Sequence, residues 1–453
     1  MKMNRRQFLN HTCATGTTAL TSVTALGSLG MMRSASAQTA GDYRALVCIL
    51  LAGGNDAYNM LVPTDGPQYA AYSTIRSDLA LPRDTLLALN FPETSDRTFG
   101  LHPGMGRLAG LINSGDAAMV ANVGTLLEPF DAQAVENGTA TLPVGLFSHA
   151  DQIAQWQTAM PDQRSAVGWG GRMADLMQGI NLANGVSMNV SLSGSNTFQS
   201  GRTTNEFSIT SEGDGALSIN GYDEDSFFGD FRRRTTDSLL SPTRTQILRS
   251  EYRRRFRDAI DSNTTFATAM QDAAQLQTTF SANGLSQALR QVARVISARD
   301  QLGAARQTFF VTVGGWDHHD EVIQNQARML PMVSNALAEF RDALVELAAF
   351  DAVTTFTISD FARTLTSNGR GSDHGWGGHH VVMGGDVSGG RLFGDYPLLA
   401  DNSVLDVGRG IYAPTLATDE YFADLALWFG VSDSDLALVL PNVRRFVASG
   451  SGS

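Results

Sequence analysis

The sequence predicts an α/β protein in which helices cover both faces of a mostly parallel central sheet, a three-layer α/β/α arrangement. Apolar runs rich in β-branched and aromatic residues are typical of buried parallel strands, and they occur at 44–51, 308–313 and 353–358. Between the last two runs, apolar residues recur at three- and four-residue steps from Leu330 to Leu347. That spacing indicates a helix packed on a sheet. Each run ends in polar residues, and open α/β sheets bind ligands at the carboxyl ends of their strands.

The remaining elements follow from the same patterns. In chain order we expect a helix over 105–113, a strand over 117–123, a helix that begins near Ser148, an edge strand over 186–192 and a closing helix over 415–429. The stretch 186–305 is rich in Gly, Ser, Thr and Asn at first and becomes helical by pattern from 242 to 302. We expect this stretch to be an insertion, either a lid or a long variable loop followed by a helical segment. The rest of 38–453 is expected to form one domain.

Residues 1–37 are typical of a removable export signal. The run Asn4-Arg5-Arg6-Gln7-Phe8-Leu9 is a twin-arginine pattern, and Ala35-Ser36-Ala37 is a small-residue cleavage site. We therefore expect a periplasmic or secreted protein that is exported already folded. Loading of a cofactor in the cytoplasm, or folding with a bound partner, would each explain this route. No other stretch approaches the roughly eighteen uninterrupted apolar residues of a membrane span, so we expect no transmembrane segment after signal removal.

The composition excludes several kinds of chemistry. Lys2 is the only lysine, which excludes Schiff-base chemistry, pyridoxal phosphate and a phosphate-loop lysine. The chain has 33 basic and 45 acidic residues, and loss of the signal moves its net charge from −12 to −16, which argues against nucleic acid as a partner. Cys13 leaves with the signal and Cys48 lies in an apolar run, so the mature chain forms no internal disulfide.

Histidines and aspartates gather where apolar runs end or in adjoining loops. Seven histidines remain after export, and all lie beside Gly, Asp or Ser or near element ends: His102, His149, His318, His319, His374, His379 and His380. The aspartates in comparable places are Asp56, Asp317, Asp360 and Asp373. Imidazole and carboxylate are borderline-to-hard ligands, so this mixture predicts a site for a divalent ion such as zinc, manganese or calcium. The spacing matches no helical metal-binding motif.

Ser148 has two interpretations. Its hydroxyl caps the helix that begins beside it, which is a purely structural role. Alternatively, the same helix N-terminus activates the hydroxyl beside a metal ion or His149. A metal-free serine hydrolase built on Ser148 and His149 is a third reading, although residues adjacent in sequence rarely face each other correctly and no GxSxG motif is present.

A set of motifs resembles a known family. The motifs GGND, LHPGM, SHADQ, GGWDHH, SDFART, SDHGWGG and GGDVSGG, with the export signal and the closing PTLATDEYFADLALWFGV, look like the bacterial family catalogued as domain of unknown function 1501. That family is similar to the alkaline phosphatase and sulfatase superfamily, which hydrolyses phosphate or sulfate esters at one or two metal ions. The resemblance covers nearly the whole chain and implies an alkaline phosphatase-like fold. It also implies a partner from a co-encoded exported family, numbered 1800.

The resemblance implies roles by position. The metal ligands would be Asp56, Asp317, His319, Asp360, Asp373 and His374, with Ser148 as the nucleophile by position. In a hydrolase of this kind we expect His149, His318 or His319 to move protons. Two positions depart from the superfamily pattern. Glu321 stands where a histidine would complete the Asp-x-x-x-His spacing, and Phe361 replaces the histidine of the Asp-His pair. We therefore expect a one-metal or rearranged site.

These observations predict an exported, metal-dependent hydrolase of phosphate or sulfate esters, with a small-molecule or polymer ester as substrate. The altered spacing of the Asp and His motifs supports an alternative function that is not enzymatic. In that reading the protein is a catalytically degenerate member that binds a ligand or a partner protein in the envelope. Bound metal and turnover would distinguish the two.

Overall fold

The computed structural model describes residues 29–32, 42–94, 97–181, 185–217, 219–222, 224–241, 247–400 and 403–447. Apart from residues 29–32, the expected export signal at 1–37 lies outside the described residues. Within the described part of the chain, no helix combines the length and the apolar character needed to cross a membrane.

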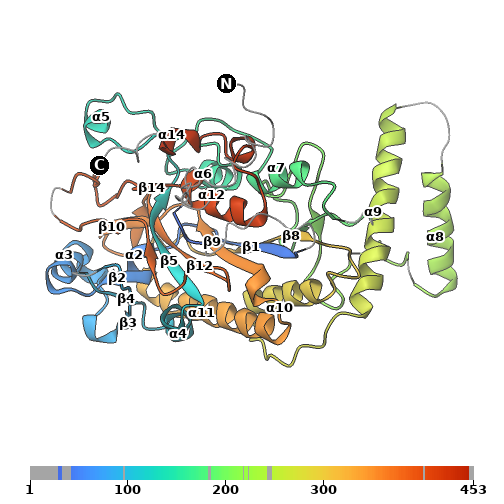
Figure 1. The fold of residues 1–453 in the computed structure, drawn as a ribbon, viewed down its shortest axis with the longest axis horizontal. Coiled ribbons are helices and arrows are strands. Elements are labelled where there is room, and N and C mark those ends of the chain that lie inside the picture. Colours follow the sequence, from blue (N-terminus) through green and yellow to red (C-terminus); the bar gives the residue numbers. More distant parts are fainter. Residues whose placement is uncertain are drawn as a thin grey trace, which may run out of the picture.

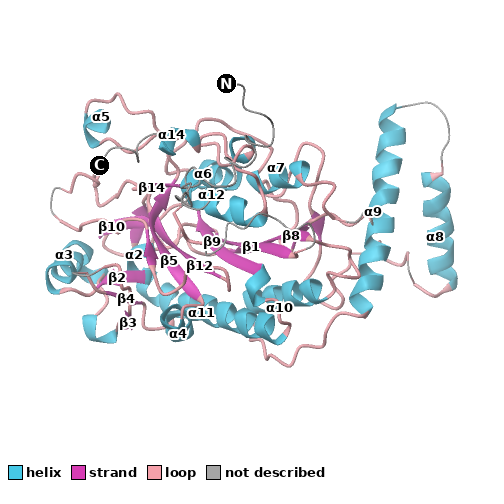
Figure 2. Ribbon diagram, viewed as in Figure 1, coloured by secondary structure: helices cyan, strands magenta, loops and turns pink. Residues whose placement is uncertain are grey.

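A nine-stranded sheet forms the centre of the molecule (Figure 2). Its strands are β1 (Arg44–Leu51), β5 (Ala117–Gly124), β6 (Asn189–Ser191), β7 (Phe207–Ser208), β8 (Arg306–Val313), β9 (Val353–Ser359), β12 (Gly378–Met383), β13 (Leu392–Phe393) and β14 (Leu416–Ala417). The order is β13-β5-β12-β9-β1-β8-β6-β7, with β14 also beside β5. β1 pairs in parallel with β8 and β9, whereas β12 runs antiparallel to β5 and β9. The mostly parallel sheet predicted from the sequence is confirmed.

The side chains of β1 alternate between two apolar cores, one on each face of the sheet. Val47 and Ile49 pack with helices α4 (Gly106–Ser114), α10 (Gly284–Ser297) and α11 (Val322–Glu346). Leu46 and Leu50 pack on the opposite face with helices α6 (His149–Thr158), α7 (Trp169–Leu176) and α12 (Thr418–Phe429). Because both faces are covered, β1 is apolar throughout rather than alternating. Figure 1 shows the resulting three layers, with α10 and α11 below the sheet and α6 and α12 above it.

Shorter elements complete the domain. They are α2 (Ala57–Met60), β2 (Leu61–Pro63), α3 (Gly66–Arg76), β3 (Leu87–Leu89), β4 (Phe99–Leu101), α5 (Ala132–Glu136), β10 (Arg363–Ser367), β11 (Ser372–His374), α13 (Leu436–Val439) and α14 (Arg444–Val447). β2, β4 and β3 form a small antiparallel sheet, and β10 pairs with β11 as a hairpin directly after β9. This hairpin brings Asp373 and His374 back to the carboxyl end of the central sheet.

The stretch 186–305 is divided between the body and a projection. β6 and β7 extend the central sheet and α10 lies in its lower layer, whereas α8 (Phe227–Leu240) and α9 (Ile247–Gln271) stand beside the body in Figure 1. α9 is attached through the ring of Phe266, 5.1 Å from that of Phe207, and through Ser262, which donates to the carbonyl of Gly185.

The helical pattern over 242–302 is interrupted between α9 and α10. There, the backbone N–H groups of Gln277 and Thr278 donate to the carboxylate of Glu346, and that of Ser281 donates to Glu339. Both acids belong to α11, so tertiary hydrogen bonds replace those that a continuous helix would make.

Residues 29–32 pack against the folded body. The backbone N–H groups of Leu29 and Met31 donate to the two carboxylate oxygens of Asp424 on α12, at 2.9 and 2.8 Å. The carbonyl of Met31 accepts from the N–H of Ser388. The Met31 side chain is fully buried in the upper core. This segment is therefore part of the folded structure.

Candidate functional site

Polar loops that follow β1, β8 and β9 meet at one edge of the sheet. Gly53 follows β1, Asp317 follows β8, and Asp360 follows β9. The β10–β11 hairpin adds Asp373 and His374, and the first residue of α6 is His149. This is the edge where open α/β sheets bind ligands.

Asp317 lies at the centre of this cluster. Its Oδ1 is 3.0 Å from Nε2 of His319 and 3.5 Å from Nε2 of His374, and its Oδ2 is 3.4 Å from Nε2 of His149. Arg363 donates to the same Oδ1 at 2.7 Å. Three imidazoles and one guanidinium thus surround a single carboxylate.

Each of these imidazoles has its other nitrogen against an oxygen acceptor. Nδ1 of His149 lies 2.6 Å from Oδ2 of Asp360, and Nδ1 of His374 lies 2.8 Å from the carbonyl oxygen of Phe147. Nδ1 of His319 lies 3.3 Å from Oδ1 of Asp373. In a neutral ring the nitrogen with the closer acceptor carries the proton, which favours Nδ1 in His149 and His374 and leaves a lone pair on their Nε2. His319 has a carboxylate oxygen against both of its nitrogens.

The Nε2 atoms of His319 and His374 are 3.0 Å apart. Two lone pairs at this distance repel unless a proton or a cation lies between them. One ligand atom each from His149, Asp317 and His374 lies within 4.8 Å of the others, as a shared metal ion requires. Metal-ligating histidines almost always donate their second N–H to an oxygen acceptor. The donor set therefore fits a divalent metal ion held by nitrogen and oxygen ligands.

The pKa shifts of Asp317, Asp373 and His374 agree with metal binding. Burial raises the pKa of Asp317, but the hydrogen bond and charge of Arg363 outweigh it and hold the pKa below its ordinary value. Burial lowers the pKa of His374, so its ring stays neutral at pH 7. A hydrogen bond from Asn368 lowers the pKa of Asp373, whereas burial raises the pKa of Asp360. Ionised carboxylates and neutral imidazoles are the forms that bind metals.

Two glycines permit the close approach of these loops. Gly53 has a φ of +121°, and a Cβ there would lie 2.5 Å from the backbone nitrogen of Asp317. Its N–H donates to Oδ1 of Asp360 at 3.0 Å. At Gly371 a Cβ would lie 2.5 Å from the carbonyl oxygen of His319. Any larger residue would push apart the loops that hold the imidazoles.

The first-strand carboxylate, Asp56, is placed differently from the cluster around Asp317. It is fully buried and forms an ion pair with Arg76 of α3, which also donates to the carbonyl of Thr364. No contact between Asp56 and the three clustered imidazoles is found among the described residues. The partner of Asp56 in the structure is thus a guanidinium rather than one of the clustered imidazoles.

The other two residues predicted to be catalytic, Ser148 and His318, make contacts that stabilise the fold. Ser148 is the N-cap of α6, and its Oγ accepts from the N–H of Asp151 at 3.4 Å. His318 is buried beside Trp316, with ring centroids 6.1 Å apart, and burial lowers its pKa. His102, His379 and His380 are also buried, and the rings of His379 and His380 pack against Tyr396 and Trp156, respectively.

The chain matches one family over most of its length. The sequence model described as "Protein of unknown function (DUF1501)" matches residues 43–436. The chain belongs to the DUF1501 family. Comparison with curated proteins gives no match for this DUF1501 chain.

Solved structures give distant similarities to this DUF1501 chain. Ps i-CgsB, in complex with k-i-k-neocarrahexaose, is 9% identical with a TM-score of 0.34, over 88% of this chain and 74% of the other. PsFucS1 sulfatase from Pseudoalteromonas sp. is 9% identical with a TM-score of 0.34, over 86% and 68%. A mutant of alkaline phosphatase PafA is 12% identical with a TM-score of 0.26, over 73% and 64%. Similarities at this level do not indicate a function for this chain. The site residues are the basis for the function proposed below.

Sequence reasoning missed the arginines of this DUF1501 site. Arg363 is fully buried and links Asp317 to the carbonyls of Gly53 and Ser372. Arg409, mostly exposed, forms an ion pair with Asp373. Arg363 lies in the SDFART motif, three residues after Asp360, and this proximity was the available signal.

Proposed function

We propose that the protein is an exported hydrolase of phosphate or sulfate esters that depends on a divalent metal ion. His149, Asp317, His319 and His374 would hold the ion. The observation that supports this proposal is the convergence of three Nε2 atoms on one carboxylate, each ring having its Nδ1 against an oxygen acceptor. A nitrogen-rich donor set of this kind favours zinc or manganese over calcium, which prefers oxygen ligands.

A bound ion would polarise the ester oxygens and lower the pKa of a water molecule or of Ser148. The chain itself supplies orientation. Asp360 fixes the ring of His149, and Arg363 fixes the carboxylate of Asp317. Arg409 beside Asp373 places a positive charge on an exposed part of the site, where an anionic ester would be attracted.

Ser148 is the proposed nucleophile. Its Oγ accepts the N–H of Asp151 and therefore retains its own O–H proton for donation. Its position at the N-terminus of α6 favours a developing negative charge.

Export by the twin-arginine route belongs to the same proposal. The Asn4–Leu9 pattern and the Ala35–Ala37 cleavage site support it. This route carries folded proteins, so the ion would enter the site in the cytoplasm and reach the periplasm or the medium with the protein.

Elemental analysis and turnover test the hydrolase proposal together. Purified protein should contain about one equivalent of zinc or manganese, and it should hydrolyse at least one member of a panel of phosphate and sulfate esters. The His374→Ala variant should lose both properties, whereas Asp320→Asn, an exposed change on the loop between β8 and α11, should keep both. Protein with no bound metal and no turnover would rule the proposal out.

One observation supports a second candidate, a binding protein without catalysis. Asp56 and Asp317 already have arginine partners, Arg76 and Arg363, which compete with metal ions for carboxylate oxygens. A protein of this kind would bind a ligand or a partner protein in the envelope, and the family numbered 1800 is the proposed partner. Stable recovery of such a partner, without ester turnover, would favour this candidate over the hydrolase.

A further inference from the structure

The hairpin of α8 and α9 exposes an unusual amount of apolar surface. Seven of its large side chains are between 63% and 88% exposed: Phe227, Phe228, Phe231, Leu239, Ile247, Leu248 and Tyr252. Gly229 is the sole buried residue of α8. Exposed apolar clusters of this kind mark interaction surfaces.

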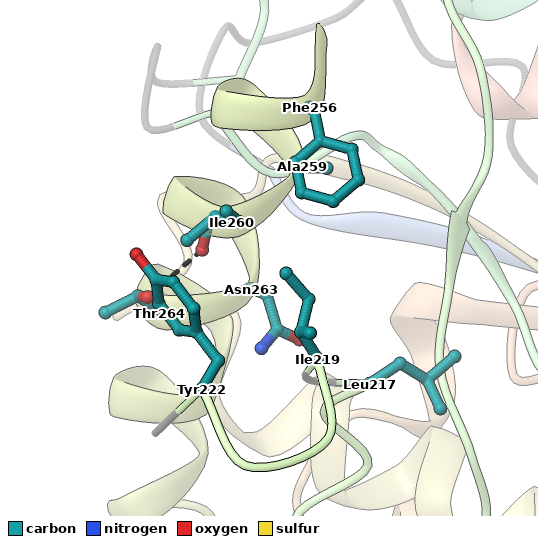
Figure 3. Close-up of a pocket in the computed structure, with 8 residues that line it drawn as sticks. All are labelled: Leu217, Ile219, Tyr222, Phe256, Ala259, Ile260, Asn263 and Thr264. Atoms are coloured by element: carbon teal, nitrogen blue, oxygen red, sulfur yellow. Dashed lines mark hydrogen bonds between the residues drawn. The ribbon is translucent and has the colours of Figure 1, made fainter. Parts of the chain in front are cut away.

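The apolar surface continues along α9 toward the body. Leu248, Tyr252, Phe256 and Ile260 recur at every fourth residue and so share one face of the helix. A groove of about 440 Å³ separates this face from Leu239 and Leu240 of α8. A second hollow of about 180 Å³ follows, where Leu217 and Ile219 lie opposite the end of the same stripe (Figure 3).

Arginines share this surface with the apolar side chains. Residues 227–271 contain nine arginines and five acidic residues, a net charge of +4 in a chain whose net charge is −12. Arg249 and Arg253 line the same groove as Leu239 and Leu248. The hairpin is thus the positively charged part of an acidic protein. Two hairpins from two copies would repel each other, so the charge favours an anionic partner over self-association.

We propose that the α8–α9 hairpin docks on the surface of an anionic phospholipid bilayer. Phe227, Phe228, Ile247 and Leu248 enter the boundary between headgroups and acyl chains, and the arginines contact lipid phosphates. This combination of aromatic and aliphatic residues with basic ones is typical of helices that lie in the membrane interface. The attachment is peripheral and does not depend on the chemistry around Asp317.

Vesicle co-sedimentation tests the proposal with the full chain. The protein should bind vesicles of phosphatidylglycerol and phosphatidylcholine in equal parts, and it should release in high salt. Vesicles of phosphatidylcholine alone should bind at least about tenfold more weakly. The double variants Phe227→Ser with Phe228→Ser, and Arg234→Gln with Arg249→Gln, should each weaken anionic binding by about tenfold or more. Val404→Ser, an exposed apolar change outside the hairpin, should leave it unchanged.

Three results would overturn the proposal. One is absence of binding to the anionic vesicles by protein whose circular dichroism shows that it is folded. Another is equal binding to neutral and anionic vesicles. The third is concentration-dependent dimerisation in analytical ultracentrifugation that the phenylalanine variant abolishes, which would assign the surface to a second copy of this chain. None of these measurements uses ester hydrolysis, so failure here is distinct from failure of the hydrolase proposal.

Discussion

The chemistry of the site depends on which nitrogen of each histidine carries the proton. His149 illustrates this, since its Nδ1 faces the buried carboxylate of Asp360 and its Nε2 faces Asp317. Both carboxylates accept, and the 2.6 Å contact with Asp360 is closer than the 3.4 Å contact with Asp317, which favours the tautomer with its proton on Nδ1 and a lone pair on Nε2. Asp360 is thus a positioning residue rather than a direct ligand in this arrangement.

The Asp360→Asn substitution tests this role. An amide can present its NH₂ group to His149, which reverses the tautomer and turns Nε2 into a donor. We expect zinc affinity to fall by about 10- to 100-fold, as for other residues that orient metal-ligating histidines, with little change in the circular dichroism spectrum. Isothermal titration measures the affinity, and Asp320→Asn is the control. An unchanged affinity in Asp360→Asn would remove Asp360 from the site.

Buried histidines predict how stability varies with pH. Burial lowers the pKa of His380 to about 3, and burial with nearby positive charge lowers that of His379 to about 3. The unfolded chain binds a proton below a pKa of about 6.5, while the folded chain does not. Stability is therefore lost as the pH falls from about 6.5 toward 3.

Urea unfolding at pH 7 and pH 5 measures this effect. Each buried histidine should contribute about 2 kcal/mol to the loss of unfolding free energy between these two pH values. His380→Gln should remove about 2 kcal/mol of that loss, because glutamine takes up no proton. Equal pH dependence in His380→Gln and the parent chain would contradict the argument.

At the scale of single residues, the sequence predicted the positions of some site residues but not of others. Asp317, His319 and His374 were predicted to lie together because polar residues at the ends of parallel strands share one edge of a sheet, and the structure brings them together. For Arg363 the sequence offered only its proximity to Asp360, because an arginine that follows a polar cluster usually faces solvent. The pairing of Asp56 with Arg76 joins β1 to α3, and no local pattern encodes such a contact.

Among the elements, the turn after β1 determines how closely the β1 and β8 loops approach. Gly53 contacts the backbone of Trp316 and Asp317 and donates to Asp360. It thus touches the loops that follow both neighbouring strands.

Gly53→Ala should disturb the site through the backbone alone. The added methyl group meets Asp317 at a positive φ, so we expect a loss of at least about 2 kcal/mol in unfolding free energy and a measurable loss of zinc affinity. Gly110→Ala on α4 is the control, because its Cβ would meet no atom within 4 Å. Chemical denaturation and metal titration report the two effects. A fully stable Gly53→Ala variant that binds zinc normally would show that the loops can separate without cost.

Element boundaries were predicted well where the pattern is local. The strand predicted over 44–51 is β1, and those predicted over 308–313 and 353–358 each differ from β8 and β9 by one or two residues. The break in the helical pattern over 242–302 could not be predicted in this way. The segment before α10 is held by hydrogen bonds to Glu339 and Glu346 of another helix, α11. Contacts between distant segments decide such breaks, and periodicity does not reveal them.

For the whole molecule, the three-layer arrangement could be predicted from the continuous apolar runs. Strands have such apolar runs when both of their faces are covered. The orientation of the α8–α9 hairpin could not be predicted. Few of its residues are buried against the body, so its sequence contains little information about where it lies.

The packing of residues 29–32 gives a prediction at this scale. Met31→Ala in the full chain should lower the unfolding free energy by about 2–4 kcal/mol, because the side chain is fully buried in the upper core. Met32→Ala, at a less buried neighbouring position, should cost much less. Chemical denaturation of the two variants gives the comparison. Equal unfolding free energies for the two variants would show that residues 29–32 do not pack against the folded body in solution.

The contacts of Asp424 have a consequence for the proposed export signal. A peptidase that cut at the proposed site after Ala37 would sever a covalent bond, but the hydrogen bonds from Leu29 and Met31 to that carboxylate would remain. The released peptide would then have to dissociate before α12 acquired its final surface. Processing would therefore occur in two kinetic steps, hydrolysis followed by dissociation, and the second would set how long the newly cut protein retains its leader.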